Sequence, residues 1–377
     1  MSGISLPVLM YHYISRYKGA TAVSPEHFED QCKGMAQAGW RGIGLTEAEA
    51  FLRDGAPLPP RSVLITFDDG YLDNYVYAWP ILQKYGHQGV VFAVTERLET
   101  SPLLRPTLHD VWAGANPALP PVDAPMHTHS LGFAERRDLF FSWEEARHME
   151  QSKVMSVAAH SARHLAVFAG SQWALPDRHA RADLAQRFHI PGTRTNTFYQ
   201  VDAPTVWGLP RFKERPALYA RAHLPCPELV AAIRRLVPQE VAEARAFFQN
   251  PLAVAELEAL LATWPSDRLV VPETDAMRHV RIQQELTLCA TTLRRELGHK
   301  VASLCWPWGS GSSPALDEGQ KQGFSVYYTT KMGANPPASA LAVHRFKVRD
   351  TGWNWLKLRL ELYSHPWLAH LYAACRL

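Results

Sequence analysis

Short apolar runs alternate with helical spacing along the first hundred residues of the chain. The apolar runs at residues 8–10, 62–67 and 89–94 have the length of buried strands, and residues 75–85 carry the spacing of a helix that ends at Gly86. A strand, a helix and a strand at this separation form a βαβ unit, which implies a parallel sheet. The pattern therefore predicts an α/β fold.

The alternation resumes after residues 100–141, a Pro-rich segment that we expect to be a long loop. Ser142 has the sequence context of a helix N-cap, and Glu145 three residues later completes a capping box. The other predicted elements are helices from Ser24, at 275–297 and at 313–322, and strands at 154–159, 301–304 and 325–329.

A segment at about residues 171–274 departs from this pattern, with loops followed by a helical stretch rich in Ala, Leu and Glu at 238–264. We interpret it as a large insertion, mainly helical or irregular. The predicted organisation is one main domain over residues 1–350, interrupted by this insertion, and an aromatic and basic tail at 351–377.

Two adjacent carboxylates, Asp68 and Asp69, directly follow the apolar run at 62–67. Like charges this close repel, and one pKa rises unless a positive group lies beside them. A solvent-exposed Asp-Gly turn would explain the pair. So would a metal site in which one Asp is a ligand and the other a base.

His160 and His164 have the i, i+4 spacing that lets two imidazoles face one ion. Since the chain has 17 histidines, such a pair also arises by chance, on a surface helix or in the core. Together with Asp69, the pair makes two imidazoles and one carboxylate, a common ligand set for catalytic Zn²⁺. A dication beside Asp69 would leave Asp68 ionised and available as a base.

The candidate site residues all follow predicted strands. His12 follows residues 8–10, and the segment Trp306 to Gly309 follows residues 301–304. Active sites of barrels and open parallel sheets are built at this carboxyl edge. We therefore expect these residues to lie together.

Composition narrows the class of protein. The chain is 47% hydrophobic and 20% charged, and its 39 basic and 36 acidic residues leave a net charge of +3, too small to favour nucleic acid as a partner. Its five cysteines are widely spread and form no C-x-x-C pair, which suits a reducing compartment. The first residues, MSGISLPVLMYHYIS, lack the features of a signal peptide or a transmembrane span. We expect a cytoplasmic protein.

The segments TFDDG, HSARH and CWPWG resemble the first three motifs of the polysaccharide deacetylase family. The N-terminal segment VLMYHYIS is similar to the start of the circularly permuted, poly-N-acetylglucosamine deacetylase-like members. Together the resemblance covers roughly residues 5–99, 142–170 and 275–348. It implies a distorted (β/α) barrel and a metal-dependent hydrolase that removes acetyl groups from N-acetylated sugars.

The resemblance also implies residue roles. Asp68 would be the general base, and Asp69, His160 and His164 would hold a divalent metal, Zn²⁺ or alternatively Co²⁺, Ni²⁺ or Mn²⁺. The backbone N–H of Trp308 would stabilise the tetrahedral oxyanion.

The acid that protonates the departing amine is assigned to His12, because the permuted members carry this His first, with His344 as the alternative. Two positions depart from the family pattern. Tyr13 stands where an acidic residue often follows the His, and Cys305 stands where commoner members have an Arg that orients the base. Arg345 is a candidate to replace that charge.

Candidate substrate contacts complete the predicted site. Trp306 and Trp308 could wall an acetyl pocket or stack on a sugar, although either could instead be a core residue. His127 and His129 lie in the Pro-rich loop outside the motifs, and we give them a structural role. The substrate-binding candidates are Tyr71, Trp306, Pro307, Gly309 and Arg345.

The tail mixes Trp and Tyr with Lys and Arg, a composition found in segments that lie on anionic membrane surfaces. A helix packed on the domain explains the tail equally well, and Pro366 would interrupt a long helix. With the membrane interpretation, the protein would contact the inner face of the membrane peripherally. The insertion would then cover the site and select the substrate.

The predicted function is removal of N-acetyl groups from N-acetylhexosamine units of a glycan or glycolipid, such as a lipopolysaccharide-core or lipid-linked sugar. Two alternatives stay open: a catalytically silent sugar-binding protein on the same fold, and a deformylase.

Overall fold

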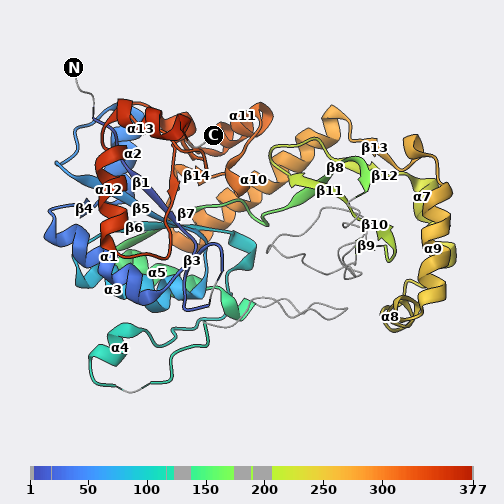
Figure 1. Cartoon of the computed structure of the whole chain (residues 1–377), viewed down its shortest axis with the longest axis horizontal. Coiled ribbons are helices and arrows are strands. Elements are labelled where there is room, and N and C mark those ends of the chain that lie inside the picture. Colours follow the sequence, from blue (N-terminus) through green and yellow to red (C-terminus); the bar gives the residue numbers. More distant parts are fainter. Residues whose placement is uncertain are drawn as a thin grey trace.

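The computed structural model describes residues 4–17, 19–115, 117–122, 137–173, 188–189 and 206–375. Eight strands form one sheet in which every pairing is parallel. The sheet curls into a distorted (β/α) barrel (Figure 1), which confirms the predicted fold class. Its order is β15 (Val326–Tyr328), β14 (Ser303–Cys305), β7 (Met155–Ala159), β6 (Gly89–Ala93), β5 (Ser62–Asp69), β1 (Val8–Tyr11) and β16 (Phe346–Lys347), with β4 (Arg41–Gly42) paired to the start of β5.

Helices cover the outside of this sheet (Figure 1). Two of the predicted helices, α10 and α11, have the predicted bounds, and Ser24 and Ser142 are N-caps as predicted. The predicted helix at 75–85 instead begins with a π-helical turn, Asn74–Ala78. The helices are α1 (Pro25–Gln37), α2 (Leu45–Asp54), α3 (Trp79–Lys84), α4 (Leu108–Trp112), α5 (Trp143–Gln151), α10 (Asp275–Leu297) and α11 (Ser313–Gln322).

Short 3-10 turns and one two-stranded pair complete the barrel. The pair, β2 (Tyr13–Ile14) and β3 (Ala22–Val23), directly follows β1 at the edge that carries the candidate residues. The turns are Thr95–Arg97, Arg137–Leu139, Pro307–Gly309 and Ala340–Ala342.

The central strands are buried on both faces, which explains their continuous apolar runs. In β5, Val63, Ile65 and Phe67 belong to the apolar cluster beneath the outer helices, and Leu64 belongs to the cluster inside the barrel. Since strand side chains alternate between faces, Asp68 shares the inner face with Leu64.

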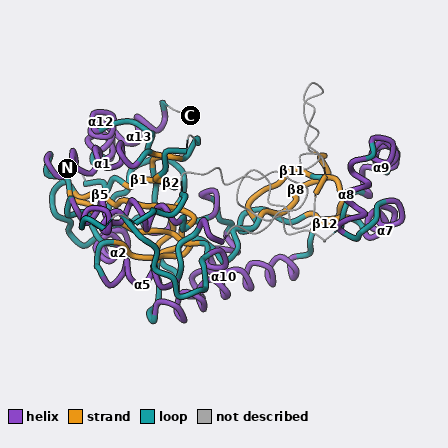
Figure 2. Tube along the Cα trace, turned by 90° about the horizontal axis from the view of Figure 1, so that it is seen from below, coloured by secondary structure: helices purple, strands orange, loops and turns teal. Residues whose placement is uncertain are grey.

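The elements from β8 to β13 build a second apolar cluster beside the barrel, here called the smaller body (Figure 1). Three antiparallel two-stranded pairs, which the sequence pattern did not indicate, accompany the predicted helical stretch, and α10 extends from the barrel toward them (Figure 2). The elements are β8 (Ala166–Trp173), β9 (Phe188–His189), β10 (Leu209–Pro210), β11 (Phe212–Pro216), β12 (His223–Pro225), α7 (Pro227–Leu236), α8 (Val241–Gln249), α9 (Pro251–Thr263), a 3-10 turn (Ser266–Arg268) and β13 (Val270–Pro272).

The C-terminal tail forms α12 (Trp353–Tyr363) and α13 (Pro366–Ala374), with the break at the predicted proline. Leu356 and Leu360 are fully buried in the barrel's outer cluster, and Tyr363 stacks on Phe346 of β16. The tail is therefore packed on the domain. None of the helices in the described residues has the length and apolar character needed to cross a bilayer.

Candidate active site

The carboxyl ends of four strands of the sheet, β1, β5, β7 and β14, bring the predicted residues together. His12 follows β1, Asp68 and Asp69 end β5, His160 follows β7, and Trp306 follows β14. These residues lie at the edge of the sheet where the sequence pattern placed them, because all four strands run in parallel.

Asp69, His160 and His164 form a compact donor set. One ligand atom of each lies within 4.8 Å of the others. His160 Nε2 is 3.5 Å and His164 Nε2 is 3.7 Å from Asp69 Oδ1. Two ligands at about 2.0–2.1 Å from a tetrahedral ion are separated by roughly 3.3 Å. The three side chains therefore fit a divalent metal with little rearrangement.

Neighbouring groups fix the orientation of these donors. The Nδ1 of His160 lies 2.9 Å from the Cys305 carbonyl oxygen, which can only accept, so Nδ1 carries the proton and Nε2 presents its lone pair. The Tyr71 hydroxyl donates to Asp69 Oδ2 over 2.8 Å, leaving Oδ1 facing the imidazoles.

Burial and nearby charges keep Asp69, His160 and His164 in the protonation states that a metal ligand needs. Burial lowers the pKa of His160 and, more strongly, that of His164, so both imidazoles are neutral. Burial alone would raise the pKa of Asp69, but His164 and His160 bring it below its usual value. A neutral imidazole pair beside an ionised carboxylate is the protonation state that metal binding requires.

The site is built on backbone conformations that side chains rarely adopt. Asp69 (φ 78°), Ser161 (φ 64°), His164 (φ 54°) and Trp308 (φ 52°) all lie in the left-handed region. Ser161 supports this turn because its hydroxyl accepts the backbone N–H of His164 at 3.0 Å. Such strained positions are common at functional sites, where the surrounding structure maintains them.

Asp68 forms a buried bidentate ion pair with Arg345. Nη1 and Nη2 of the guanidinium lie 2.7 and 2.8 Å from the two carboxylate oxygens, and Arg345 is 1% exposed. Burial would raise the pKa of Asp68, but the charge and hydrogen bonds of Arg345 hold it far below its usual range. Asp68 is therefore ionised throughout the working pH range.

A second donor set, Asp68, His160 and Cys305, is equally compact. The Arg345 guanidinium contacts two of its members, with Nη2 3.0 Å from the sulfur of Cys305. Burial raises the pKa of the Cys305 thiol well above its usual value. A fixed cation and a protonated thiol disfavour a metal there, so the Asp69 set is the better candidate.

Two predicted substrate contacts are placed elsewhere by the structure. Arg345 is enclosed and pairs with Asp68, so it orients the base and does not face a substrate. Tyr71 is 2% exposed, stacks on Tyr13 and Phe140, and directs its hydroxyl to Asp69. Both side chains are buried, and each directs its polar group to an aspartate, so neither is available to a substrate.

The structure distinguishes the two candidate acids. His12 Nε2 lies 3.9 Å from Asp68 Oδ2, and its side chain is 22% exposed, so it can reach both the site and solvent. His344 contacts Gly333, and its nearest titratable neighbours are His370 and Lys331. Since Arg345 points to Asp68, alternation along the chain turns His344 away from the site.

The CWPWG segment divides between core and site. Trp306 is buried and stacks on Tyr327, so it is a core residue and not a sugar platform. Pro307 is likewise buried. Gly309 has φ 75°, and a Cβ there would approach Thr330 Oγ1 to 2.2 Å, so its role is steric. Only Trp308 is half-buried, with its ring centroid 4.4 Å from that of His164.

The sequence analysis missed Arg97, which is 2% exposed and lies over the Phe140 ring. Its positive charge is one of the factors that lower the pKa values of Asp69, Tyr71 and Tyr13. No motif marks it, since an Arg in a 3-10 turn after β6 has no distinctive spacing. The loop histidines His127 and His129 lie outside the described residues.

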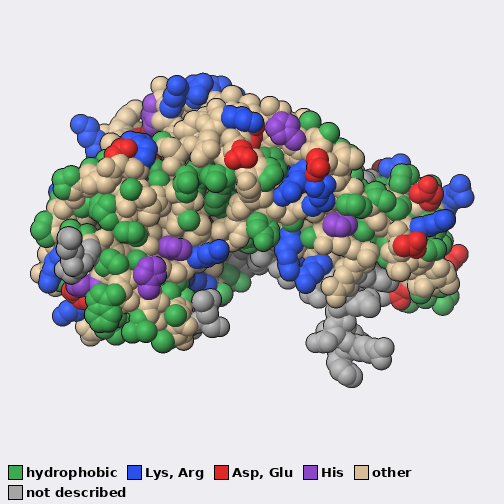
Figure 3. All heavy atoms as spheres, turned by 90° about the horizontal axis from the view of Figure 1, so that it is seen from above, with side chains coloured by type: hydrophobic (Ala, Val, Ile, Leu, Met, Phe, Trp, Pro, Cys, Tyr) green, Lys and Arg blue, Asp and Glu red, His purple; other side chains and the backbone are tan. Residues whose placement is uncertain are grey.

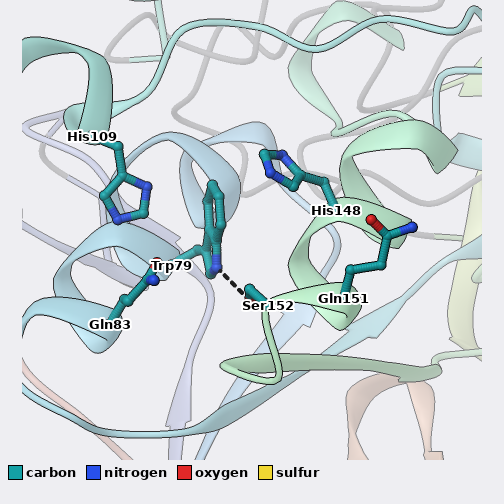
Figure 4. Close-up of a pocket in the computed structure, with 6 residues that line it drawn as sticks. All are labelled: Trp79, Gln83, His109, His148, Gln151 and Ser152. Atoms are coloured by element: carbon teal, nitrogen blue, oxygen red, sulfur yellow. Dashed lines mark hydrogen bonds between the residues drawn. The ribbon is translucent and has the colours of Figure 1, made fainter. Parts of the chain in front are cut away.

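A separate recess of about 480 Å³ lies among α3, α4 and α5 (Figure 4). Trp79 lies between His109 and His148 and donates its indole N–H to Ser152 over 2.9 Å. None of the predicted site residues lines this recess, which lies on the outer helices and not at the strand ends.

Residues 55–189 match the family model described as polysaccharide deacetylase. Over this stretch the chain is similar to polysaccharide deacetylases. The match includes Asp68, Asp69, His160 and His164, the residues that the fold brings to one edge.

Two curated relatives are similar to parts of this chain. A Bacillus subtilis protein named for polysaccharide deacetylase, YxkH, is 39% identical over 89 residues, or 24% of this chain and 32% of its own length. The poly-beta-1,6-N-acetyl-D-glucosamine N-deacetylase of Escherichia coli K12 is 24% identical over 143 residues, 37% of this chain and 18% of its own length. The chain thus spans about a third or less of these relatives.

The fold has solved counterparts. A de-N-acetylase from Aggregatibacter actinomycetemcomitans superposes with a TM-score of 0.55 at 19% identity, covering 94% of this chain and 98% of its own. At this identity the likeness concerns the fold, and it extends over nearly the whole chain.

Proposed function

We propose that this protein is a metal-dependent N-deacetylase that hydrolyses the acetamide of N-acetylhexosamine units in a glycan. The observation that carries the proposal is the placement of a complete ligand set, Asp69, His160 and His164, beside an ionised carboxylate, Asp68, and a partly exposed imidazole, His12. The names of the curated relatives support the same reaction class.

Asp69, His160 and His164 would hold the metal, and the separations of their donor atoms suit Zn²⁺ or a similar ion. When bound, such an ion lowers the pKa of water and polarises the amide carbonyl. The chain supplies the remaining chemistry.

Asp68 takes the proton of the attacking water as the new C–O bond forms. Arg345 keeps this carboxylate ionised and fixes both oxygens, so its direction is set before substrate arrives. His12, whose Nε2 lies 3.9 Å from Asp68 Oδ2, donates a proton to the departing amine as the C–N bond breaks. The products are acetate and a free amino sugar.

The backbone of Trp308 is the proposed oxyanion donor. Its left-handed conformation and the contact of its ring with His164 bring this turn to the rim of the ligand set. A backbone N–H at this position would stabilise the negative oxygen of the tetrahedral intermediate.

The smaller body is proposed to select the substrate. It is continuous with the site, because β8 begins two residues after His164 and Trp308 packs against its apolar cluster. Its attachment beside the ligand set would let it contact sugars on either side of the one being hydrolysed.

A glycolipid or lipopolysaccharide-core acceptor, a cytoplasmic location and contact with the inner membrane face remain proposals from the sequence. Exposed Trp367 and Leu371 on one face of α13 are compatible with such contact. The buried face of α12 contributes to the fold instead.

Acetate release from N-acetylated glycans tests the proposal. Wild-type protein and an Asp54→Asn control should release acetate, because Asp54 is exposed and pairs only with Arg53. Asp68→Asn should reduce the rate by about 10²–10⁴-fold while metal content stays unchanged. No release from wild-type protein carrying metal would contradict the proposal. Formate release from the N-formylated counterparts of these glycans, with no acetate release from the N-acetylated forms, would identify a deformylase.

A further inference from the structure

A recess of about 270 Å³ lies between β16, α12 and α13, close to the site but not part of it. Three cations line it, Lys347, Arg349 and Arg359, together with Trp355, Phe346 and Tyr372. No carboxylate is among its described lining residues. A concave surface with concentrated positive charge and aromatic walls is suited to an anionic ligand.

The recess holds Arg359 in place before any ligand arrives. Its Cζ lies 4.2 Å from the centroid of the Trp355 ring, Nη1 donates to the Trp355 carbonyl over 3.2 Å, and Nη2 donates to the Tyr372 hydroxyl over 3.4 Å. A guanidinium held in this way loses little side-chain entropy when it binds a further acceptor.

The three charges are not neutralised within the described part of the chain. None of the hydrogen bonds that these three side chains form in that part of the chain involves a carboxylate. Asp350, which follows Arg349, is committed to the start of α1, where one oxygen accepts from Ser24 N and Oγ at 2.9 and 2.8 Å and lies 2.7 Å from His27 Nδ1. Glu361, two residues after Arg359, has a carboxylate oxygen 3.9 Å from Arg61 Nη2. Burial lowers the pKa of Lys347, and the charge of Arg349 lowers it further. The three charges are therefore available to an anionic ligand that enters the recess.

The recess lies at the same edge of the sheet as the candidate active site. Lys347 is the register partner of Met10, two residues before His12. One strand spacing and two residues place the Cα atoms of His12 and Lys347 roughly 8 Å apart. Ala20, in the loop that follows His12 and β2, lines the recess as well. A glycan bound with one residue beside His12 would extend its neighbouring group into the recess.

We propose that this recess binds a phosphate ester carried by the glycan next to the N-acetylhexosamine that is hydrolysed. Three converging cations match the charge of a phosphate, about −1.5 to −2 at pH 7 for a monoester, better than the single charge of a carboxylate. This proposal rests on the proposed deacetylase function and assigns its substrate class, a phosphorylated glycan, whether soluble or linked through phosphate to a lipid.

Kinetic discrimination between matched substrates tests the proposal. The substrates are an N-acetylglucosamine oligosaccharide with a reducing-end phosphate and the same oligosaccharide without it. Wild-type protein should prefer the phosphorylated form by kcat/KM. Lys347→Met should reduce that preference about tenfold, the size expected for one charge-assisted contact. Lys357→Met should keep the preference, because Lys357 is exposed on α12 outside the recess. Equal rates on both substrates in wild-type protein would overturn the proposal.

Binding without turnover separates this proposal from the deacetylase proposal. The Asp68→Asn protein is titrated calorimetrically with the phosphorylated oligosaccharide, its prenyl-phosphate counterpart, inorganic phosphate and a glucuronate-ended oligosaccharide. Tight binding of the phosphorylated forms, weakened by an added Arg349→Gln, supports the site even if wild-type protein releases no acetate. Equal binding of the glucuronate form, or no effect of Arg349→Gln, overturns the site even if acetate is released. The prenyl form binding more tightly than the soluble form would identify the lipid-linked source.

Discussion

The barrel and the smaller body bury their strands in different ways. Every residue of β5 and β6 is buried, and their apolar side chains fill clusters on both faces of the sheet. In β11 of the smaller body, buried Phe212 is followed by exposed Lys213 and Arg215. The barrel thus encloses its strands, while the smaller body presents one face of its strands to solvent, as antiparallel pairs often do.

This difference in burial suits the two regions to different tasks, which are holding charged groups in place and presenting a polar surface. The enclosed barrel can hold charged groups such as Asp68 and Arg345 at fixed distances, because each is surrounded on all sides. The smaller body offers an open polar surface beside them. Basic side chains are spread over several places of the molecular face seen in Figure 3 and are not gathered in one stripe. The enclosed barrel thus suits the proposed chemistry, and the open surface of the smaller body suits its proposed role in substrate selection.

The largest expected effect is loss of the metal centre from the barrel. His164→Ala should remove nearly all bound metal and reduce acetate release more than 10³-fold, because a two-ligand site binds too weakly. Metal analysis of the purified protein checks this. His299→Ala is the control, since His299 is half-exposed and pairs with Glu150. Full metal content in His164→Ala would exclude His164 as a ligand.

Arg345→Met tests whether the barrel depends on the buried ion pair. Removing the guanidinium leaves Asp68 as an uncompensated buried charge, which costs about 3–5 kcal/mol of unfolding free energy. Burial then raises the pKa of Asp68, so the acid limb of the kcat/KM profile should move to higher pH. Denaturant unfolding and a pH–rate profile measure both effects, with exposed Arg53→Met as control. An unmoved acid limb would mean that Asp68 is not the titrating base.

Leu257→Ala tests whether the smaller body can be destabilised without affecting the barrel. Leu257 is fully buried in the smaller body, and the cavity should cost about 2–5 kcal/mol locally. Hydrogen exchange should then accelerate in α7 and α9 while β5 and β6 keep their protection. Exposed Leu252→Ala should change neither. Equal loss of protection in both regions would show one cooperative unit and remove the distinction.

Tyr71→Phe should weaken metal binding by about 10–100-fold without unfolding the barrel. The substitution removes the hydrogen bond that orients Asp69, an interaction of the kind that tunes metal affinity. Competition with a chromogenic chelator gives the dissociation constant. Tyr75→Phe, which loses a contact with His148 on the outer helices, is the matched control. Equal affinities would assign Tyr71 a packing role only.

The smallest expected effect concerns His87, which is buried between α1 and the end of β4. Its Nδ1 accepts the Gly42 N–H and its Nε2 donates to the Cys32 carbonyl, and burial lowers its pKa. The unfolded chain binds this proton first, so unfolding free energy is lost as pH falls below about 6.5. His87→Gln can keep both hydrogen bonds without titrating. Its unfolding free energy should therefore fall less between pH 7.5 and 5.5, and an identical slope would contradict the assignment.

The sequence predicted the parts of the molecule in which local pattern and burial agree. Enclosed strands leave continuous apolar runs, so most strands of the sheet were found with bounds one or two residues off. The bounds of α10 and α11, whose caps the sequence displays, were predicted correctly. The clustering of the site residues at the carboxyl edge of the sheet was predicted because the strands were expected to be parallel. The half-exposed pairs of the smaller body leave no comparable run, and their partners lie far apart in sequence, as Phe212 and Trp173 do.

The residues of the site likewise differ in how far the sequence alone predicts them. Adjacent Asp68 and Asp69 and the spaced histidines are local signals. The partners that tune them come from distant segments, since Arg345 lies 277 residues from Asp68 and Cys305 lies 145 residues from His160. Arg345 was predicted both as the charge beside the base and as a substrate contact, and the structure shows the first contact. Tyr71 was predicted as a substrate contact because a sequence does not show which polar group is enclosed.

The account rests on different tasks for two neighbouring carboxylates, and metal content measured together with acetate release tests this most directly. Asp69→Asn should lose the metal and the activity. Asp68→Asn should keep the metal at the wild-type level and lose only the activity. Metal retained in Asp69→Asn but lost from Asp68→Asn would reverse the two roles and contradict the account.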